Sequence, residues 1–183
     1  MNWDELESIC RQCQQCKLSA TRTNVVFGVG NRQSSILFVG EGPGYHEDLQ
    51  GEPFVGDAGK LLDKILASVH FSRQDVYIAN IVKCRPPNNR DPEPDEIECC
   101  MSFLRHQFLL LRPKILVCLG RVAAKAIIHP DFAITRQRGQ WFERKGCFIM
   151  ATFHPSALLR DESKKAFVWE DMKAIRKKYD ELV

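Results

Sequence analysis

Apolar runs alternate with amphipathic segments along most of the chain. Four short apolar runs have the character of β-strands buried on both faces, and the segments after them carry apolar residues at helical spacing. The predicted strands are 35–39, 76–79, 115–119 and 148–152. The predicted helices are 2–13, 57–69, about 97–108, 121–128 and a last one from about 163. This alternation predicts an α/β fold of three layers (α/β/α), with a four-stranded, mainly parallel central sheet in one domain, residues 1–183.

Local signals refine the ends of these elements. Asn2 and Glu5 have the spacing of a capping box, and Asp57 is placed to cap the second helix. The Gly- and Pro-rich segment 40–56 is predicted to be a long loop, and the polar stretch after 128 to be irregular or an edge hairpin. The last helix is expected to bury Phe167, Met172, Ile175 and Tyr179.

Composition narrows the class of protein but not its partner. With 183 residues, 44% of them hydrophobic and 27% charged, the chain can form a real core and is not a disordered tail. No stretch approaches the roughly 18 apolar residues of a membrane span, and the first residues are acidic where a signal peptide is basic. We therefore expect a cytoplasmic protein with no membrane partner. The net charge of +3 allows a local basic groove without establishing a polyanionic partner.

Chemically capable side chains follow the predicted strands at their carboxyl ends. Gly40-Glu41-Gly42-Pro43-Gly44 follows the first, Asn80 the second, Gly120-Arg121 the third and His154 the fourth. In an open parallel sheet the ligand site lies at this edge, so a carboxylate, an amide and an imidazole are predicted to meet there. Each of them alone is more often a turn former or helix cap. The first loop is too short for a phosphate-binding loop and lacks its Lys, so a nucleoside triphosphate is not the obvious ligand.

The eight cysteines are poor disulfide candidates in a cytoplasmic protein, so metal binding or catalysis is weighed first. Five of them form a C-x-x-C pair and two later sites: Cys13, Cys16, Cys84, Cys99 and Cys100. Four thiolates gathered in this way suit either zinc or a cubane iron–sulfur cluster, and the spacing does not choose between them. Cys118 and Cys147 lie in or beside a strand and are interpreted as small buried hydrophobic residues.

An ordered set of motifs runs from about residue 10 to 160. The motifs are Cys13-x-x-Cys16-Lys17-Leu18, Val26-Phe27-Gly28-Val29-Gly30, Gly40-Glu41-Gly42-Pro43-Gly44, Glu47-Asp48, Gly51-x-Pro53-Phe54-Val55-Gly56-x-Ala58-Gly59-x-Leu61-Leu62, Asn80-x-x-Lys83-Cys84-Arg85-Pro86-Pro87-x-Asn89-Arg90 and His154-Pro155-Ser156. This set resembles the iron–sulfur (family 4) uracil-DNA glycosylases. The resemblance implies a uracil-DNA glycosylase fold and an enzyme that flips uracil out of DNA, hydrolyses its N-glycosidic bond and leaves an abasic site.

The resemblance also implies a [4Fe-4S] cluster. Its ligands, carried over position by position, are Cys13, Cys16, Cys84 and Cys100, which leaves Cys10 and Cys99 unmatched. A structural role for the cluster, tying the N-terminal arm to the loop after Cys84, is the simplest. A related family traps uracil covalently through a basic insertion with a His after the second strand. The loop 85–94 has no His here, so ordinary turnover is expected.

The strand-end residues acquire roles under this resemblance. Asn80 offers the amide that complements the N3–H and O4 of uracil, Phe54 stacks on the base, and backbone amides from Gly40 to Gly42 complete the contacts. His154 donates to uracil O2 as negative charge develops, and Glu41 is the main acid/base residue. Glu47 is the runner-up for that role and is also placed near the C5 edge of uracil, where it disfavours thymine. The sequence does not separate the two carboxylates.

A flipped base requires contacts that open the duplex. The segment 157–160 is expected to insert an apolar side chain into the minor groove, while Arg160, Lys164 and Lys165 contact phosphate. Ser156 and Leu158 are also expected to contact DNA. A second basic cluster consists of Lys83, Arg85 and Arg90. The expected partners are uracil-containing single- and double-stranded DNA, and the protein is expected to be a monomer.

Three alternatives remain open from the sequence. A non-enzymatic iron–sulfur protein, either a redox sensor or a DNA-binding module, needs none of Glu41, Asn80 and His154. A glycosylase of broader choice, acting on hypoxanthine or on thymine opposite guanine, keeps the fold, although Asn80 and Glu41 weigh against it. A zinc protein is colourless, whereas a cubane iron–sulfur protein is yellow-brown.

Overall fold

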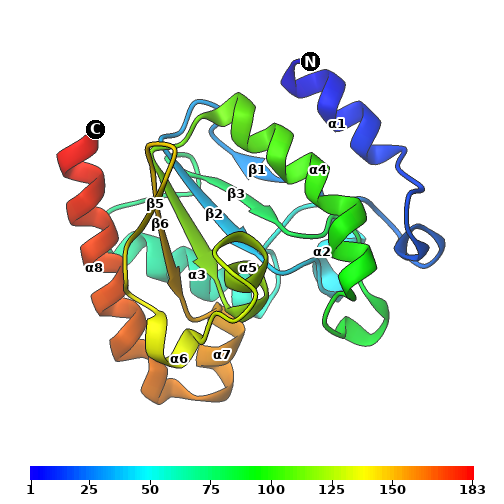
Figure 1. Ribbon diagram of the computed structural model, residues 1–183. Helices are drawn as coiled ribbons and strands as arrows, with labels where there is room; N and C mark the ends of the chain where they lie inside the picture. Colours follow the sequence, from blue (N-terminus) through cyan, green and yellow to red (C-terminus); the bar gives the residue numbers. More distant parts are fainter.

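The computed structural model describes residues 1–183 and is built around one mixed sheet with strand order β1-β3-β2-β4-β6-β5 (Figure 1). Its centre is four parallel strands: β3 (Tyr77–Asn80), β2 (Ile36–Gly40), β4 (Ile115–Leu119) and β6 (Cys147–Thr152). Two antiparallel strands, β1 (Val29–Gly30) and β5 (Phe142–Arg144), close the edges. The α/β prediction and the four inner strands are confirmed. The count of four was wrong because edge strands of two and three residues are too short to give a readable alternation.

Helices cover both faces of the sheet, which gives the three predicted layers (Figure 1). One face is covered by α1 (Trp3–Arg11), α4 (Pro94–Leu111) and α5 (Arg121–Ile127). The other is covered by α3 (Asp57–Ser68), α7 (Pro155–Arg160) and α8 (Lys165–Leu182). Leu37 and Val39 of β2 belong to the first core, and Ile36 and Phe38 to the second. A strand buried on both faces needs apolar side chains at every position, which explains the continuous run.

The remaining elements are short and lie in the connections. They are α2 (Tyr45–Gln50), α6 (Ile134–Gln137) and three 3₁₀ helices at Lys17–Ala20, Pro87–Asn89 and Glu162–Lys164. The segment predicted to be one long loop therefore contains a helix, α2. None of the helices combines the length and the apolar character that crossing a bilayer requires.

The predicted helix ends agree with the structure in one case and differ in another. Asn2 Oδ1 accepts from the backbone N–H of Glu5 at 2.9 Å and the Glu5 carboxylate accepts from Asn2 N at 3.0 Å, which confirms the capping box. The capping prediction for Asp57 is wrong, because Asp57 is the first residue inside α3 and Gly56 is its N-cap. The N–H of Gly56 donates instead to the Glu47 carboxylate, 2.7 Å away.

The outer helix α8 and the surface show how the apolar residues are distributed. Met172 and Ile175 are buried as predicted, and Tyr179 packs against their core. The prediction that Phe167 is buried is wrong, because Phe167 lies at the start of α8 and is 45% exposed.

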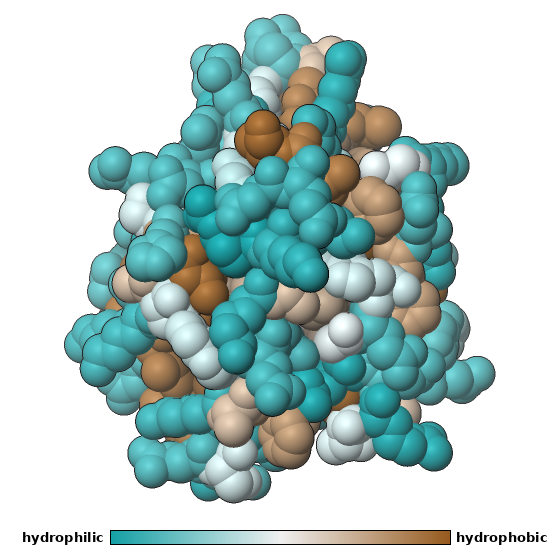
Figure 2. Space-filling view, turned by 90° about the vertical axis from the view of Figure 1, so that its left-hand side faces the viewer, coloured by the Kyte–Doolittle hydropathy of each residue, from teal (hydrophilic) through white to brown (hydrophobic).

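Figure 2 shows a face that is hydrophilic over most of its area, with apolar residues in separate small areas rather than one broad patch.

Candidate active site

The carboxyl ends of the parallel strands open into a cavity of about 660 Å³. The prediction that a carboxylate, an amide and an imidazole meet at this edge is therefore confirmed in its geometry. All predicted uracil-contacting residues except Gly40 line the cavity: Glu41, Gly42, Glu47, Phe54, Asn80 and His154. Gly40 pairs with Asn80 in the β2–β3 register, directly beneath the cavity floor.

Asn80 ends β3 with a side chain that is only 2% exposed. Its Oδ1 has no hydrogen-bond partner, although almost every buried polar atom in a protein has one. A Cβ on Gly40 would lie 2.6 Å from this oxygen and 2.6 Å from Cζ of Phe54, so only glycine lets the amide and the ring approach each other here. The cavity therefore has an unpaired acceptor beside an aromatic ring.

Phe54 is held in a constrained backbone conformation. Its φ of 55° lies in the left-handed region, which is unusual for a bulky residue and marks a built feature. The Arg73 guanidinium donates to the carbonyl of Phe54 and, at 3.0 Å, to that of Pro53. A side chain on Gly59 would overlap the Phe54 carbonyl, so α3 packs directly on this turn. Sequence reasoning missed Arg73, because only the fold brings it to this loop.

His154 presents an N–H group to the cavity. Its Nδ1 accepts from the backbone N–H of Ser156 at 3.0 Å and lies 2.8 Å from the Ser156 hydroxyl. Burial lowers the pKa of His154 to about 4, with the Arg160 charge acting in the same direction and Glu47 opposing. Since a backbone N–H can only donate, Nδ1 is the bare nitrogen of a neutral ring and Nε2 carries the proton. The ring lies stacked beside Phe54, with 5.4 Å between the centroids.

The two carboxylates of the cavity have different environments. Burial raises the pKa of Glu41 to about 7, and the neighbouring Asp91 carboxylate adds to the rise. Glu47 instead accepts from three backbone N–H groups, those of Gly44 at 3.0 Å, Val55 at 2.9 Å and Gly56 at 2.7 Å. One Glu47 oxygen thus caps the start of α2 and the other fastens the turn that follows Phe54, whereas the Glu41 carboxyl group contacts that of Asp91.

Six cysteines line a second hollow, which we call the cysteine corner: Cys10, Cys13, Cys16, Cys84, Cys99 and Cys100. They come from α1, the arm that follows it, the segment after β3, and α4. Arg22 donates to Cys13 O at 2.7 Å and contacts Cys84 Sγ at 3.4 Å, and the backbone N–H of Lys83 donates to Cys100 Sγ at 3.3 Å. No group of three or more His, Cys, Asp or Glu side chains is arranged to hold a single metal ion. Cys118 and Cys147 are buried elsewhere, as expected for hydrophobic residues.

Comparison with known proteins agrees with this geometry. A sequence model of the Uracil DNA glycosylase superfamily matches residues 27–175. The chain is 48% identical over 167 residues to the type-4 uracil-DNA glycosylase of Archaeoglobus fulgidus, covering 85% of this chain and 84% of that one. The chain belongs to the type-4 uracil-DNA glycosylases. The same enzyme type from Thermotoga maritima is 45% identical over 168 residues (88% and 86% covered), and a type-5 uracil-DNA glycosylase from Pyrobaculum aerophilum is 32% identical over 146 residues (70% and 64%).

Two of the residues predicted to contact DNA are buried in this member of the family. Lys83 is 1% exposed, and its ammonium donates to Asn80 O at 2.9 Å and to Gln107 Oε1 at 2.7 Å. Leu158 is also 1% exposed, because the helical turn of α7 directs it into the core. The burial of both side chains argues against direct contact with DNA in this conformation. Leu159, the next residue, is 53% exposed.

The other predicted DNA contacts lie at or near the mouth of the cavity. Arg160, Ser156 and Arg90 line it. Arg85 stacks over the ring of Tyr45, which also lines the cavity, with its guanidinium carbon 5.4 Å from the centroid. Arg90 is already paired with Glu96 through two hydrogen bonds of 2.8 Å, so its charge is partly used inside the protein.

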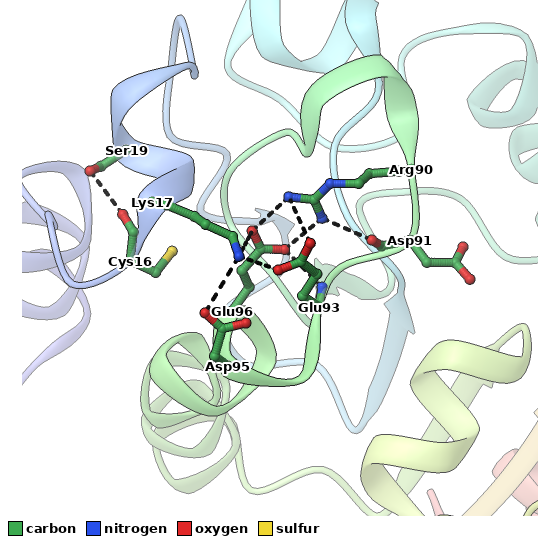
Figure 3. A network of polar contacts seen from close by, with 8 residues as sticks. All are labelled: Cys16, Lys17, Ser19, Arg90, Asp91, Glu93, Asp95 and Glu96. Atoms are coloured by element: carbon green, nitrogen blue, oxygen red, sulfur yellow. Dashed lines mark hydrogen bonds and ion pairs between the residues drawn. The ribbon is translucent and has the colours of Figure 1, made fainter.

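A polar network joins the cysteine corner to the loop at the cavity mouth (Figure 3). Lys17, next to Cys16, donates to Glu93 and lies 3.7 Å from the Asp95 carboxylate. Arg90 donates to Glu96 of the same helix start and, at 3.0 Å, to Asp91 O. The segment that carries Asp91 is thereby fastened to the arm that carries the first cysteines.

Proposed function

We propose that the protein removes uracil from DNA by hydrolysing the bond between uracil N1 and the sugar C1′, leaving free uracil and an abasic site. The observation that carries this proposal is the unpaired Oδ1 of Asn80 on the floor of a cavity wide enough for an extruded nucleotide. Proteins of the same type carry the name uracil-DNA glycosylase, which supports the assignment.

Asn80 supplies the choice of base. Uracil offers an N3–H donor and an O4 acceptor, which match the Oδ1 acceptor and the amino group of the Asn80 amide. Cytosine has no N3–H and carries an amino group at position 4, so both sides of the amide would be mismatched in a buried site. A site built to form such hydrogen bonds rejects a mismatched base strongly. Phe54 offers its ring to any pyrimidine and adds affinity rather than choice.

His154 supplies the stabilisation of the leaving group. As the N1–C1′ bond breaks, its electron pair passes to uracil and the negative charge spreads over O2 and O4, while positive charge develops on the sugar. The neutral ring donates its Nε2–H to O2, a kind of contact worth about 2.7 to 4 kcal/mol in a preorganised site.

Glu41 supplies the proton acceptor. Its ionised carboxylate takes a proton from the attacking water while the water oxygen bonds to C1′, and its negative charge favours the sugar cation. The hydrogen bonds that Glu47 accepts from the backbone favour a positioning role for it, at the turn that carries Phe54. The assignment of Glu41 ahead of Glu47 therefore rests on their different partners.

The proposed cofactor is a [4Fe-4S] cluster held by Cys13, Cys16, Cys84 and Cys100. The donor set fits such a group, because these thiols surround one hollow and soft thiolate ligands suit iron–sulfur clusters. Burial raises the pKa of Cys100 to about 11, so iron would have to displace the thiol proton when it binds. When bound, the cluster supplies a rigid cross-link between the N-terminal arm and α4, and hydrolysis needs no redox step.

The proposal includes the setting of the reaction. We propose a monomeric cytoplasmic enzyme of one domain that acts on single- and double-stranded DNA and extrudes the uracil nucleotide into the cavity. The basic residues at the cavity mouth, Arg85 and Arg160, support contact with the phosphates on either side.

Release of free uracil from a labelled single-stranded oligonucleotide tests the function. Matched oligonucleotides with cytosine or thymine at the same position are the controls. We expect release from the uracil substrate alone. Cluster-loaded protein that binds all three oligonucleotides and releases no base would overturn the proposal in favour of a DNA-binding module.

A further inference from the structure

Asp91 is a carboxylate of the cavity to which the proposed reaction assigns no role. It lies in the loop between β3 and α4, lines the same cavity as Glu41, and is within hydrogen-bonding reach of the Glu41 carboxyl group. Arg121, the first residue of α5, donates to its Oδ2 at 2.6 Å. Two carboxyl groups and one guanidinium from three separate segments thus form a chain that ends in the cavity.

We propose that Asp91, held by Arg121, is a positioning residue that shares one proton with Glu41 and fixes the orientation of the Glu41 carboxyl group in the cavity. This inference rests on the proposed function, because it concerns the residue to which that function gives the proton.

The first argument is electrostatic. Two carboxyl groups in hydrogen-bond contact do not both ionise readily, so the pair holds one proton over a range of pH. The hydrogen bond from Arg121, followed by that with Glu41, lowers the pKa of Asp91. Burial, followed by the contact with Asp91, raises the pKa of Glu41 to about 7. The proton therefore belongs to Glu41, whose O–H donates to the Asp91 carboxylate.

The second argument is geometric. Two contacts hold Asp91: Arg121 donates to its carboxylate, in a pair whose side chains are both about half exposed, and Arg90 donates to its backbone carbonyl at 3.0 Å. Arg90 is in turn paired with the buried carboxylate of Glu96, at the start of α4. A carboxylate anchored in this way can orient a second one, whereas a freely rotating loop residue could not.

The consequence for the reaction concerns the strength of the base. Above a pH of about 7, Glu41 loses its proton to solvent and can accept one from the attacking water. Because Asp91 raises the proton affinity of Glu41, the ionised Glu41 is a stronger base than an isolated carboxylate. As the pH falls through about 7 the base form is lost, so the rate falls on the acid side.

Other charges around the pair act in known directions. Arg121 and Arg160 lower the pKa of Glu41, and Lys125 lowers that of Asp91. The remaining charged or titratable groups that line the cavity are Tyr45, His46, Glu47, Asp57, Arg90, His154 and Lys164. Among the acidic residues near Glu41, Asp91 is its hydrogen-bond partner, so Asp91→Asn removes this one contact.

Asp91→Asn tests the proposal in two readouts. The first is the pH profile of single-turnover uracil release between pH 5 and 9, and the second is a ¹³C NMR titration of the Glu41 carboxyl carbon, which does not depend on activity. We expect both midpoints to fall by roughly one pH unit, and the rate on the high-pH plateau to fall several-fold because the base is weaker. Asp95→Asn is the matched control, because Asp95, like Asp91, has an exposed side chain but is paired with Lys17 rather than with Glu41.

Two outcomes would overturn the inference. An unchanged Glu41 midpoint in folded, cluster-loaded Asp91→Asn protein would show that the two carboxyl groups share no proton. Equal shifts in Asp91→Asn and Asp95→Asn would reduce the effect to general surface charge. Failure of the proposed function is separate: Glu41→Gln protein that releases uracil at the wild-type rate would remove the role of Glu41 as base, whatever the NMR titration shows.

Discussion

The cavity and the cysteine corner lie at the two ends of one short segment, 80–84, and they differ in how their buried groups are satisfied. Asn80 at one end keeps an amide oxygen without a partner. At the other end burial raises the pKa of Cys84, and Arg22 opposes the rise. An unpaired neutral acceptor suits a ligand that arrives and leaves, whereas several thiols around one hollow suit the proposed cluster, which stays bound once the thiols have lost their protons. Under the proposed function, one segment thus serves both turnover and permanent attachment.

Lys83 lies between the two regions and belongs to both. Its ammonium donates to Asn80 O, and its backbone N–H donates to Cys100 Sγ at 3.3 Å. Burial lowers the pKa of Lys83 to about 8. A buried cation of this kind holds the floor of the cavity and the wall of the corner in a fixed relation.

Removal of the unpaired amide should have the largest effect. Asn80→Ala deletes both hydrogen bonds to the uracil edge, and we expect the kcat/KM for uracil release to fall by roughly 10³-fold. Stopped-time release assays on a single-stranded substrate measure this. A fall in kcat/KM of less than threefold would mean that other residues recognise the base. The unpaired amide would then not distinguish the cavity from the cysteine corner.

Removal of the imidazole should have the next largest effect. His154→Ala removes the N–H donor to O2, and the rate of bond cleavage should fall by about 10²-fold. Since the pKa of His154 is held at about 4, the ring stays neutral as the pH falls through 7, and the acid limb of the rate belongs to Glu41. ¹⁵N NMR of His154 between pH 5.5 and 8 should show a proton on Nε2 alone. A ring that gains a second proton in this range would contradict the account.

Loss of one proposed cluster ligand should mainly reduce binding of the cluster and, to a smaller extent, the rate of the reaction. Cys100→Ser should lower the iron content and the melting temperature, with roughly a tenfold loss of activity as the nearby loop loosens. Cys118→Ser is the matched control, because Cys118 is buried in β4 away from the corner. Iron analysis and thermal denaturation measure the difference. Equal iron content in the two variants would remove Cys100 from the ligand set.

The smallest effect is expected at the exposed leucine beside the cavity. Leu159→Ala should slow release from double-stranded DNA by about threefold and leave single-stranded DNA unaffected, because a wedge is needed only where bases are stacked. Leu109→Ala, in an exposed leucine of α4, is the control. Equal effects on single- and double-stranded substrates would show that Leu159 supports the protein fold and does not insert into duplex DNA.

The sequence predicts the parts of this molecule that depend on local pattern. The inner strands could be read because burial on both faces demands apolar residues at every position. Glu41, Asn80 and His154 could be placed together because parallel strands deliver their carboxyl ends to one edge. The short helix α2 and the edge strand β1 could not be read, since a few residues carry no period.

The errors and omissions concern tertiary contacts. Residue type and neighbours predict a surface position for Lys83 and Leu158, but both are buried. Lys83 donates to the Gln107 side chain, and the helical phase of α7 directs Leu158 into the core. The sequence did not reveal Asp91, because its partner Glu41 lies 50 residues away in the chain. It did not reveal Arg73 either, because its partner Phe54 lies about 20 residues away. A contact that depends on the conformation of loops leaves no periodic pattern in the sequence.

The most direct test of the central claim is base release from two matched oligonucleotides, one with uracil and one with N3-methyluracil. The methyl group removes the N3–H that the free Oδ1 of Asn80 would accept and leaves the glycosidic bond in place. The account predicts rapid release of uracil, no release of N3-methyluracil, and loss of this difference in Asn80→Ala. Equal release of both bases by the wild-type protein would show that the buried amide does not read uracil.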